Sequence, residues 1–163
     1  MRTAIRAIIL SFIVLWLGGV LFFPIVAASA FSSIQDTHAA GTIVAKCLRF
    51  LHYEGLFSGA VIIILLLVAQ VLKAVPRTVA PAVVITLIML ALTAFSQFSI
   101  IPRMENYRIA AGGAIDAVSP HNPNRIAFNK LHNTSVHVEE GVLLAGLVLV
   151  FLVAWNYPQQ PAA

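Results

Sequence analysis

Four stretches of the chain are rich in apolar residues and are separated by more polar segments. The apolar stretches cover about residues 7–30, 54–73, 78–101 and 137–155. As helices rising about 1.5 Å per residue, they match the roughly 30 Å thickness of a bilayer core. The pattern predicts an all-α polytopic membrane protein, a four-transmembrane-helix bundle that forms a single domain over residues 1–163.

Polar residues run without a break into the second and fourth apolar stretches. The apolar residues 141–155 form a helix of only about 22 Å, which must recruit residues upstream to cross the bilayer. We therefore expect helices 2 and 4 to extend beyond the bilayer on one side. The expected boundaries are a polar connection over 31–45, a helix 2 start near Gly41 or Thr42, a helix 3 end before Pro102, and a helix 4 start at Arg125 with Asn124 as its cap.

Composition supports a membrane protein. Of the 163 residues, 60% are hydrophobic and only 10% are charged, whereas soluble domains carry about 25% charged residues. The net charge of +4 is spread without a basic run, which argues against nucleic acid and favours the lipid bilayer as the partner. The single cysteine, Cys47, excludes an intramolecular disulfide. The first apolar stretch is longer than the core of about 7–15 residues typical of a signal peptide, so we expect a retained membrane helix.

Four spans place both termini on one side of the membrane. That side receives four basic residues and no acid, and the opposite side receives six basic residues, all six acids and all five histidines. The raw count of basic residues points to the opposite side as the cytoplasmic one. However, the four lie in very short flanks, and several of the six lie in helix extensions where acids can pair with them. We expect both termini in the cytoplasm and the protein in the cell inner or plasma membrane.

The ionisable side chains gathered at that opposite end indicate a binding site. At 100° per residue, His132, Ser135 and Glu139 share one face of the last helix. Imidazole and carboxylate groups together bind divalent metals. The same groups can instead form a closed hydrogen-bond network in which Arg103 pairs with a glutamate, since no diagnostic spacing such as HExxH is present. The candidate ligands are His52, His132, His137, Glu139 and Glu140, and the candidate polar network is Arg103, Ser135 and Glu105.

Small and polar residues within the apolar stretches are typical of contacts between membrane helices. Thr86, Thr93 and Gln97 form a polar stripe that should face the bundle interior and hydrogen-bond between helices. No Ser-His-Asp order and no nucleotide-binding loop is present, so no catalytic residue is predicted. The helix-packing candidates are Gly18, Gly19, Gly55 and Gly59.

Four short blocks carry a family resemblance. They are LWLGGVLFF at 15–23, GTIV at 41–44, PRM at 102–104 and FNKLHNTS at 128–135. In this order the chain resembles the transmembrane protein 205-like family, four-span membrane proteins of unknown function. The resemblance implies a polytopic membrane protein and no particular reaction. It points to Trp16, Gly18, Pro102, Arg103, His132 and Ser135, and does not include His137, Glu139 or Glu140.

Three functions are compatible with these features. The first is binding or passing a metal ion or small solute at the histidine-rich end. The second is a haem-binding membrane oxidoreductase with His52 and His132 as axial ligands, so the cofactor could be a divalent metal or haem. The third is a non-enzymatic accessory subunit that forms a homo- or hetero-oligomer through its small-residue helix faces.

Overall fold

A computed structural model describes residues 2–74 and 78–155, and every regular element within them is helical. Four helices are long and apolar enough to cross a membrane. The chain is therefore an integral membrane protein with an all-α four-helix bundle, as the apolar pattern predicted. The elements are α1 (Arg2–Ser33), α2 (Thr37–Val71), α3 (Ala80–Phe95), the π-helix η1 (Ser96–Ile100), α4 (Ile101–Ala110) and α5 (Pro123–Trp155).

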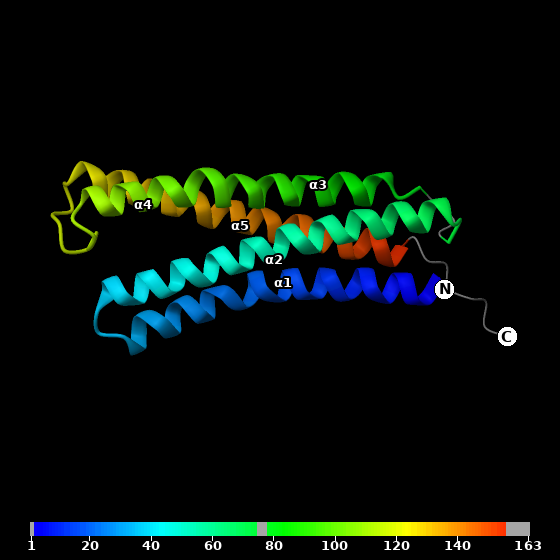
Figure 1. Cartoon of the computed structure of the whole chain (residues 1–163), viewed down its shortest axis with the longest axis horizontal. Coiled ribbons are helices and arrows are strands. Elements are labelled where there is room, and N and C mark those ends of the chain that lie inside the picture. Colours follow the sequence, from blue (N-terminus) through cyan, green and yellow to red (C-terminus); the bar gives the residue numbers. More distant parts are fainter. Residues whose placement is uncertain (1, 75–77, 156–163) are drawn as a thin grey trace.

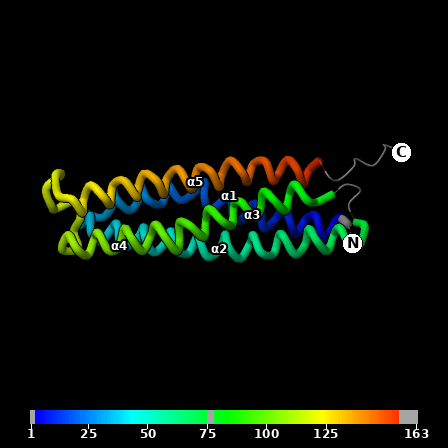
Figure 2. The backbone as a smooth tube through the Cα atoms, turned by 90° about the horizontal axis from the view of Figure 1, so that it is seen from above, coloured from blue at the N-terminus to red at the C-terminus, as the bar shows by residue number. Residues whose placement is uncertain are grey.

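The bundle has an up-down-up-down arrangement in which α3, η1 and α4 form one continuous helix (Figure 1). Both α1 and α3 pack against α2 and α5, so the four helices close around one core. The start of α1 and the end of α5 lie at the same end of the bundle (Figure 2). The candidate spans contain 31 to 35 residues, or about 50 Å at 1.5 Å per residue. The first and third helices are thus nearly as long as the second and fourth.

Apolar side chains fill the interior and also cover the outside. Ile9, Ile62 and Leu149 are fully buried between the helices. On the outer faces, Val71 is 80% exposed and Phe57 is 64% exposed. A surface of this kind requires an apolar surrounding, which the acyl chains of a bilayer supply.

The connection between the first two helices is shorter than expected. Only residues 34–36 separate α1 from α2, rather than the polar segment 31–45. The side chain of Asp36 accepts a hydrogen bond of 2.9 Å from the backbone N–H of His38 and so caps α2. Thr42 donates its hydroxyl to the carbonyl of His38 within the same helix. The polar residues of this segment are therefore satisfied by helix formation, and α2 begins several residues before Gly41.

Pro102 does not end the third helix, contrary to expectation. Proline lacks an N–H and its ring clashes with the carbonyl four residues earlier in a regular helix. The five residues of η1 form a π-helix directly before it, and Pro102 then occupies the first turn of α4. A wider turn at this point relieves the conflict, so the helix continues to Ala110.

The last helix starts two residues before the predicted position. Pro123 is its first residue, where the missing N–H is harmless. The side chain of Asn122, rather than that of Asn124, acts as the cap: Asn122 Oδ1 accepts a hydrogen bond of 2.9 Å from the backbone N–H of Asn124.

Glycines mark the closest helix contacts. A methyl group added at Gly55 would lie 2.3 Å from Nε1 of Trp16, and one at Gly59 would lie 2.6 Å from Leu90. Gly19 similarly faces Leu51, whereas Gly18 has nothing within 4 Å. The Gly55–Gly59 face is thus occupied by α1 and α3 of the same chain.

Candidate functional site

His52 lies at the centre of a buried polar cluster formed by three helices. Its imidazole is 1% exposed. Nδ1 lies 3.0 Å from Oε1 of Gln97 in η1, and Nε2 lies 2.7 Å from Oε1 of Glu139 in α5. The histidine thus joins α2 to both of the helices that face it across the core.

The close packing of α1 on α2 and the π-helix position these groups. Gly55 and Gly59 follow His52 at i+3 and i+7 and let the indole of Trp16 lie directly against α2. Gln97 belongs to the π-helix, a local form that recurs at functional sites. The cluster lies near the middle of the helices, since His52 is residue 16 of the 35 in α2 and Glu139 is residue 17 of the 33 in α5. Relative to the apolar stretches, however, both residues lie at the outer edge, because His52 precedes Gly55 by three residues and Glu139 precedes Gly141 by two.

Both ring nitrogens of His52 face oxygen atoms. Oε1 of Gln97 and Oε1 of Glu139 are acceptors, so both nitrogens can donate when the imidazole carries two hydrogens. A glutamine side chain has both an acceptor and a donor, so rotation of the Gln97 amide lets its NH₂ group donate to a deprotonated Nδ1. His52 then still donates from Nε2 to Glu139.

Further polar groups surround the cluster. The hydroxyls of Thr93 and Ser96, within one turn of Gln97, are buried and have no hydrogen-bond partner in the described part of the chain. Glu54 accepts a hydrogen bond from the hydroxyl of Ser58, and its Oε2 is buried without a partner among the described residues. Polar groups without partners are costly in an apolar interior, which is typical of a functional region rather than of simple packing.

The other predicted ligands do not join His52. His132 is exposed on α5. Seven residues separate it from Glu139, about 10 Å along the helix axis, so the two share a face but not a height. His137 and Glu140 pair with each other at 3.0 Å, with side chains 78% and 62% exposed. The expected convergence of His52 with His132 is therefore wrong, whereas its meeting with Glu139 is observed.

The three residues of the predicted polar network are not bonded to one another in the described part of the chain. Ser135 is buried in α5. Arg103 is exposed and makes no ion pair within residues 2–74 and 78–155, so its expected pairing with a glutamate is wrong. Glu105 pairs with Arg108 at 2.6 Å instead. Arg108 is three residues from Glu105 on the same helix face, and Arg103 is two residues away and points elsewhere.

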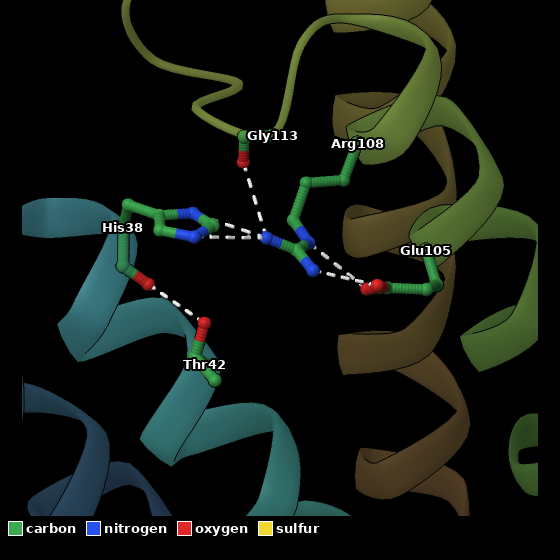
Figure 3. Close-up of polar contacts among 5 residues, drawn as sticks. All are labelled: His38, Thr42, Glu105, Arg108 and Gly113. Carbon is green, nitrogen blue, oxygen red and sulfur yellow. Dashed lines mark hydrogen bonds and ion pairs between the residues drawn. The ribbon is translucent and has the colours of Figure 1, made fainter.

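Arg108 connects the outer ends of α2 and α4. Its guanidinium donates two hydrogen bonds to the Glu105 carboxylate and one, of 3.0 Å, to Nδ1 of His38. It also donates to the carbonyl of Gly113 (Figure 3). Gly112 and Gly113 have φ angles of +86° and +93° and end α4 there. This outer cluster ties the loop after α4 to the start of α2.

A groove open to the surface lies between α2 and the η1–α4 segment and has a volume of about 350 Å³. Arg49 and Tyr53 line it from α2, Glu105 and Asn106 line it from α4, and Gln97 lines it from η1. Because Gln97 also contacts Nδ1 of His52, this amide stands between the His52–Glu139 pair and the groove.

The described residues do not form a complete metal site. Within residues 2–74 and 78–155, no group of three or more His, Cys, Asp or Glu side chains is placed to hold a metal ion. Haem ligation by His52 and His132 does not fit either, because both ring nitrogens of His52 have protein partners and His132 is exposed. Gln97 was predicted only to hydrogen-bond between packed helices. Its position in a polar stripe was the one signal for it.

Comparison with known families gives one match. A family model described as Domain of unknown function (DUF4149) matches residues 11–112, more than half of the chain. The matched region contains His52 and Gln97 and ends before α5. No curated protein and no solved structure matches the chain.

Proposed function

We propose that this chain, which belongs to the family described as Domain of unknown function (DUF4149), takes up and releases a proton at the His52–Glu139 pair, in which the imidazole is buried and the carboxylate side chain is 17% exposed. The main observation in support is that both ring nitrogens of His52 contact side-chain oxygens, at 3.0 and 2.7 Å, inside an apolar bundle. Ionisable residues within membrane helices are rare and mark ion and proton pathways. The proton is the small solute that these three residues can bind without further ligands.

The groove supplies the exchange route in this proposal. In the proton-loaded state, Gln97 accepts from Nδ1 and Nε2 shares the second proton with Glu139. When the Nδ1 proton leaves towards the groove, the Gln97 amide rotates and donates to the freed Nδ1. Each side chain keeps a hydrogen-bond partner in both states, which avoids the cost of an unpartnered buried group.

Proton flux into liposomes tests this function. The full-length chain is reconstituted with a pH-sensitive dye inside, and a pH gradient is applied with potassium and valinomycin to balance charge. We expect flux above that of empty liposomes, and its loss in His52→Gln and Glu139→Gln. His137→Gln is the matched control, because His137 belongs to an exposed His–Glu pair. Flux equal to empty liposomes, or unchanged flux in His52→Gln, would contradict the proposal.

Two further measurements distinguish metal transport and haem binding from proton exchange. Zinc or copper binding that is lost in His52→Gln would favour a metal carrier, and a Soret band in protein produced with ample haem would favour haem binding. An oligomer through small-residue faces could not use Gly55 and Gly59, which pack within the chain. The resemblance to the transmembrane protein 205-like family is compatible with a transport role and adds no substrate.

The orientation also belongs to the proposal. Both termini are proposed to lie in the cytoplasm, with the protein in the cell inner or plasma membrane. Fluorescence of a green fluorescent protein fused to the C-terminus would agree with this orientation. Activity of an alkaline phosphatase fused at the same position would reverse it.

A further inference from the structure

We propose that Lys46 and Arg49 bind the phosphate of an anionic phospholipid whose acyl chain lies along the exposed side of α2. This site is separate from the His52–Glu139 pair and does not depend on its protonation. Lipid binding at this site can therefore be tested independently of the proposed proton exchange.

The side chains concerned share one face of α2. Lys46, Arg49, Phe50 and Tyr53 follow at i, i+3, i+4 and i+7, and all four are exposed. They line a hollow of about 220 Å³, next to the groove of about 350 Å³ that also includes Arg49 and Tyr53. The lining of the smaller hollow is apolar, so the aromatic rings and the methylene stems of the two basic residues form it and the charged groups lie outside that lining.

The positive charge of this surface is only partly offset by the protein, because the Glu105 carboxyl, which pairs mainly with Arg108, also interacts electrostatically with Arg49. Neither Lys46 nor Arg49 makes a hydrogen bond or an ion pair with any residue in the described ranges. The nearby acid on the groove wall, Glu105, is already held by two hydrogen bonds from Arg108, of 2.9 and 2.6 Å. A negatively charged group is therefore the complementary ligand.

The height of the pair matches a lipid headgroup. Arg49 precedes Gly55, where the most apolar part of α2 begins, by six residues, or about 9 Å. The polar layer on each side of a bilayer core is about 5–8 Å thick, so the backbone of Arg49 lies just outside this layer and its long side chain can reach back into it. Tyr53 lies between the two, the position at which aromatic residues gather in membrane proteins.

An apolar track continues from the basic pair into the membrane. Phe50, Phe57 and Ile64 follow at intervals of seven residues and are 76%, 64% and 59% exposed. A soluble anion would use only the basic pair, whereas a phospholipid would use the basic pair and this track together. The combination favours the lipid.

Native mass spectrometry of the full-length chain in detergent tests the site. Phosphatidylglycerol and phosphatidylcholine with identical acyl chains are added separately and the bound lipid is counted. We expect tighter binding of phosphatidylglycerol, and a loss of about fivefold per basic charge removed in Lys46→Gln/Arg49→Gln. Arg103→Gln/Lys130→Gln is the matched control, because both residues are exposed basic side chains outside the hollow. Phe57→Ala should also weaken lipid binding.

Three results would overturn the site. One is equal binding of the two lipids by the unmodified chain. Another is an equal loss in both double variants, which would mean that only the overall charge matters. The third is full displacement of phosphatidylglycerol by millimolar inorganic phosphate, which would identify a soluble anion as the ligand. Circular dichroism of each variant confirms that the bundle is folded.

Discussion

Replacing Gly55 by alanine should destabilise the bundle, because the new methyl group would overlap the indole of Trp16. The added Cβ would lie 2.3 Å from Nε1 and 2.7 Å from Cε2 of that ring. Trp16 is 1% exposed, so its ring has no free space into which it can turn. Either α1 moves away from α2 or the tryptophan leaves its preferred rotamer.

Gly18→Ala provides the reference for the size of this effect. Gly18 lies in α1 and an added Cβ there meets nothing within 4 Å. Both substitutions change helix propensity by the same amount, about 0.8–1 kcal/mol. The difference between the two variants therefore isolates the steric overlap, for which core overpacking gives about 1–3 kcal/mol.

The assay is reversible unfolding of the full-length chain in mixed micelles with increasing sodium dodecyl sulfate, followed by circular dichroism. We expect Gly55→Ala to unfold with a free energy about 1–3 kcal/mol below that of Gly18→Ala. In a double-mutant cycle, Trp16→Phe should reduce the penalty of Gly55→Ala, since the smaller ring leaves room for the methyl group. Equal stability of the two alanine variants would show that the contact between α1 and α2 is looser than described.

Three further outcomes can be measured on the same material. Asn122→Ala should lower the free energy of unfolding by about 1 kcal/mol, because α5 loses its cap; an unchanged value would mean that the cap is not formed. Arg108→Gln should speed amide hydrogen exchange in residues 111–122, since Arg108 holds the loop through Gly113, while the half-exposed ion pair contributes less than about 1 kcal/mol to global stability. His132→Ala should change stability by less than about 0.5 kcal/mol, because this side chain is exposed, and a large loss of stability or of proton flux would restore it as a site residue.

The sequence was sufficient for the four spans and the polar stripe but not for where the helices end. Apolar runs report directly on burial in lipid, and Thr86, Thr93 and Gln97 are buried as predicted. Only Gln97 bonds to another helix, since Thr86 donates to a carbonyl of its own helix and Thr93 has no partner among the described residues. The prediction that the third helix ends before Pro102 was wrong because the effect of a proline depends on the turn before it. A π-helix has no recognisable sequence pattern. Asp36 could have been identified as the cap of α2, since aspartate is a preferred capping residue.

The site was predictable only in part, for a geometric reason. Periodicity places His132 and Glu139 on one face of α5, but it does not show which of them lies at the height of His52. That height depends on how α2 and α5 are offset along the bundle, which the contacts of Gly55 with Trp16 and of Gly146 with Leu17 determine. Such an offset is a property of several packed helices together, and no single segment of the sequence encodes it.

The position of the pair along the bundle bears on how a proton could cross. On one side, the groove reaches Gln97 directly. On the other side, the next buried hydroxyls of the third helix are those of Ser96 and Thr93, and Thr86 follows about 10 Å beyond Thr93 along the helix axis. Met89, which is 1% exposed, lies between these two threonines. A gap of this length is too wide for a direct hydrogen bond between the two threonine hydroxyls, so under the proposed function we expect this conformation to exchange protons on the groove side. Complete passage therefore requires a second arrangement of the helices around Met89, and Met89→Gln, which places a polar group in the gap, should raise the flux more than it changes proton uptake at His52.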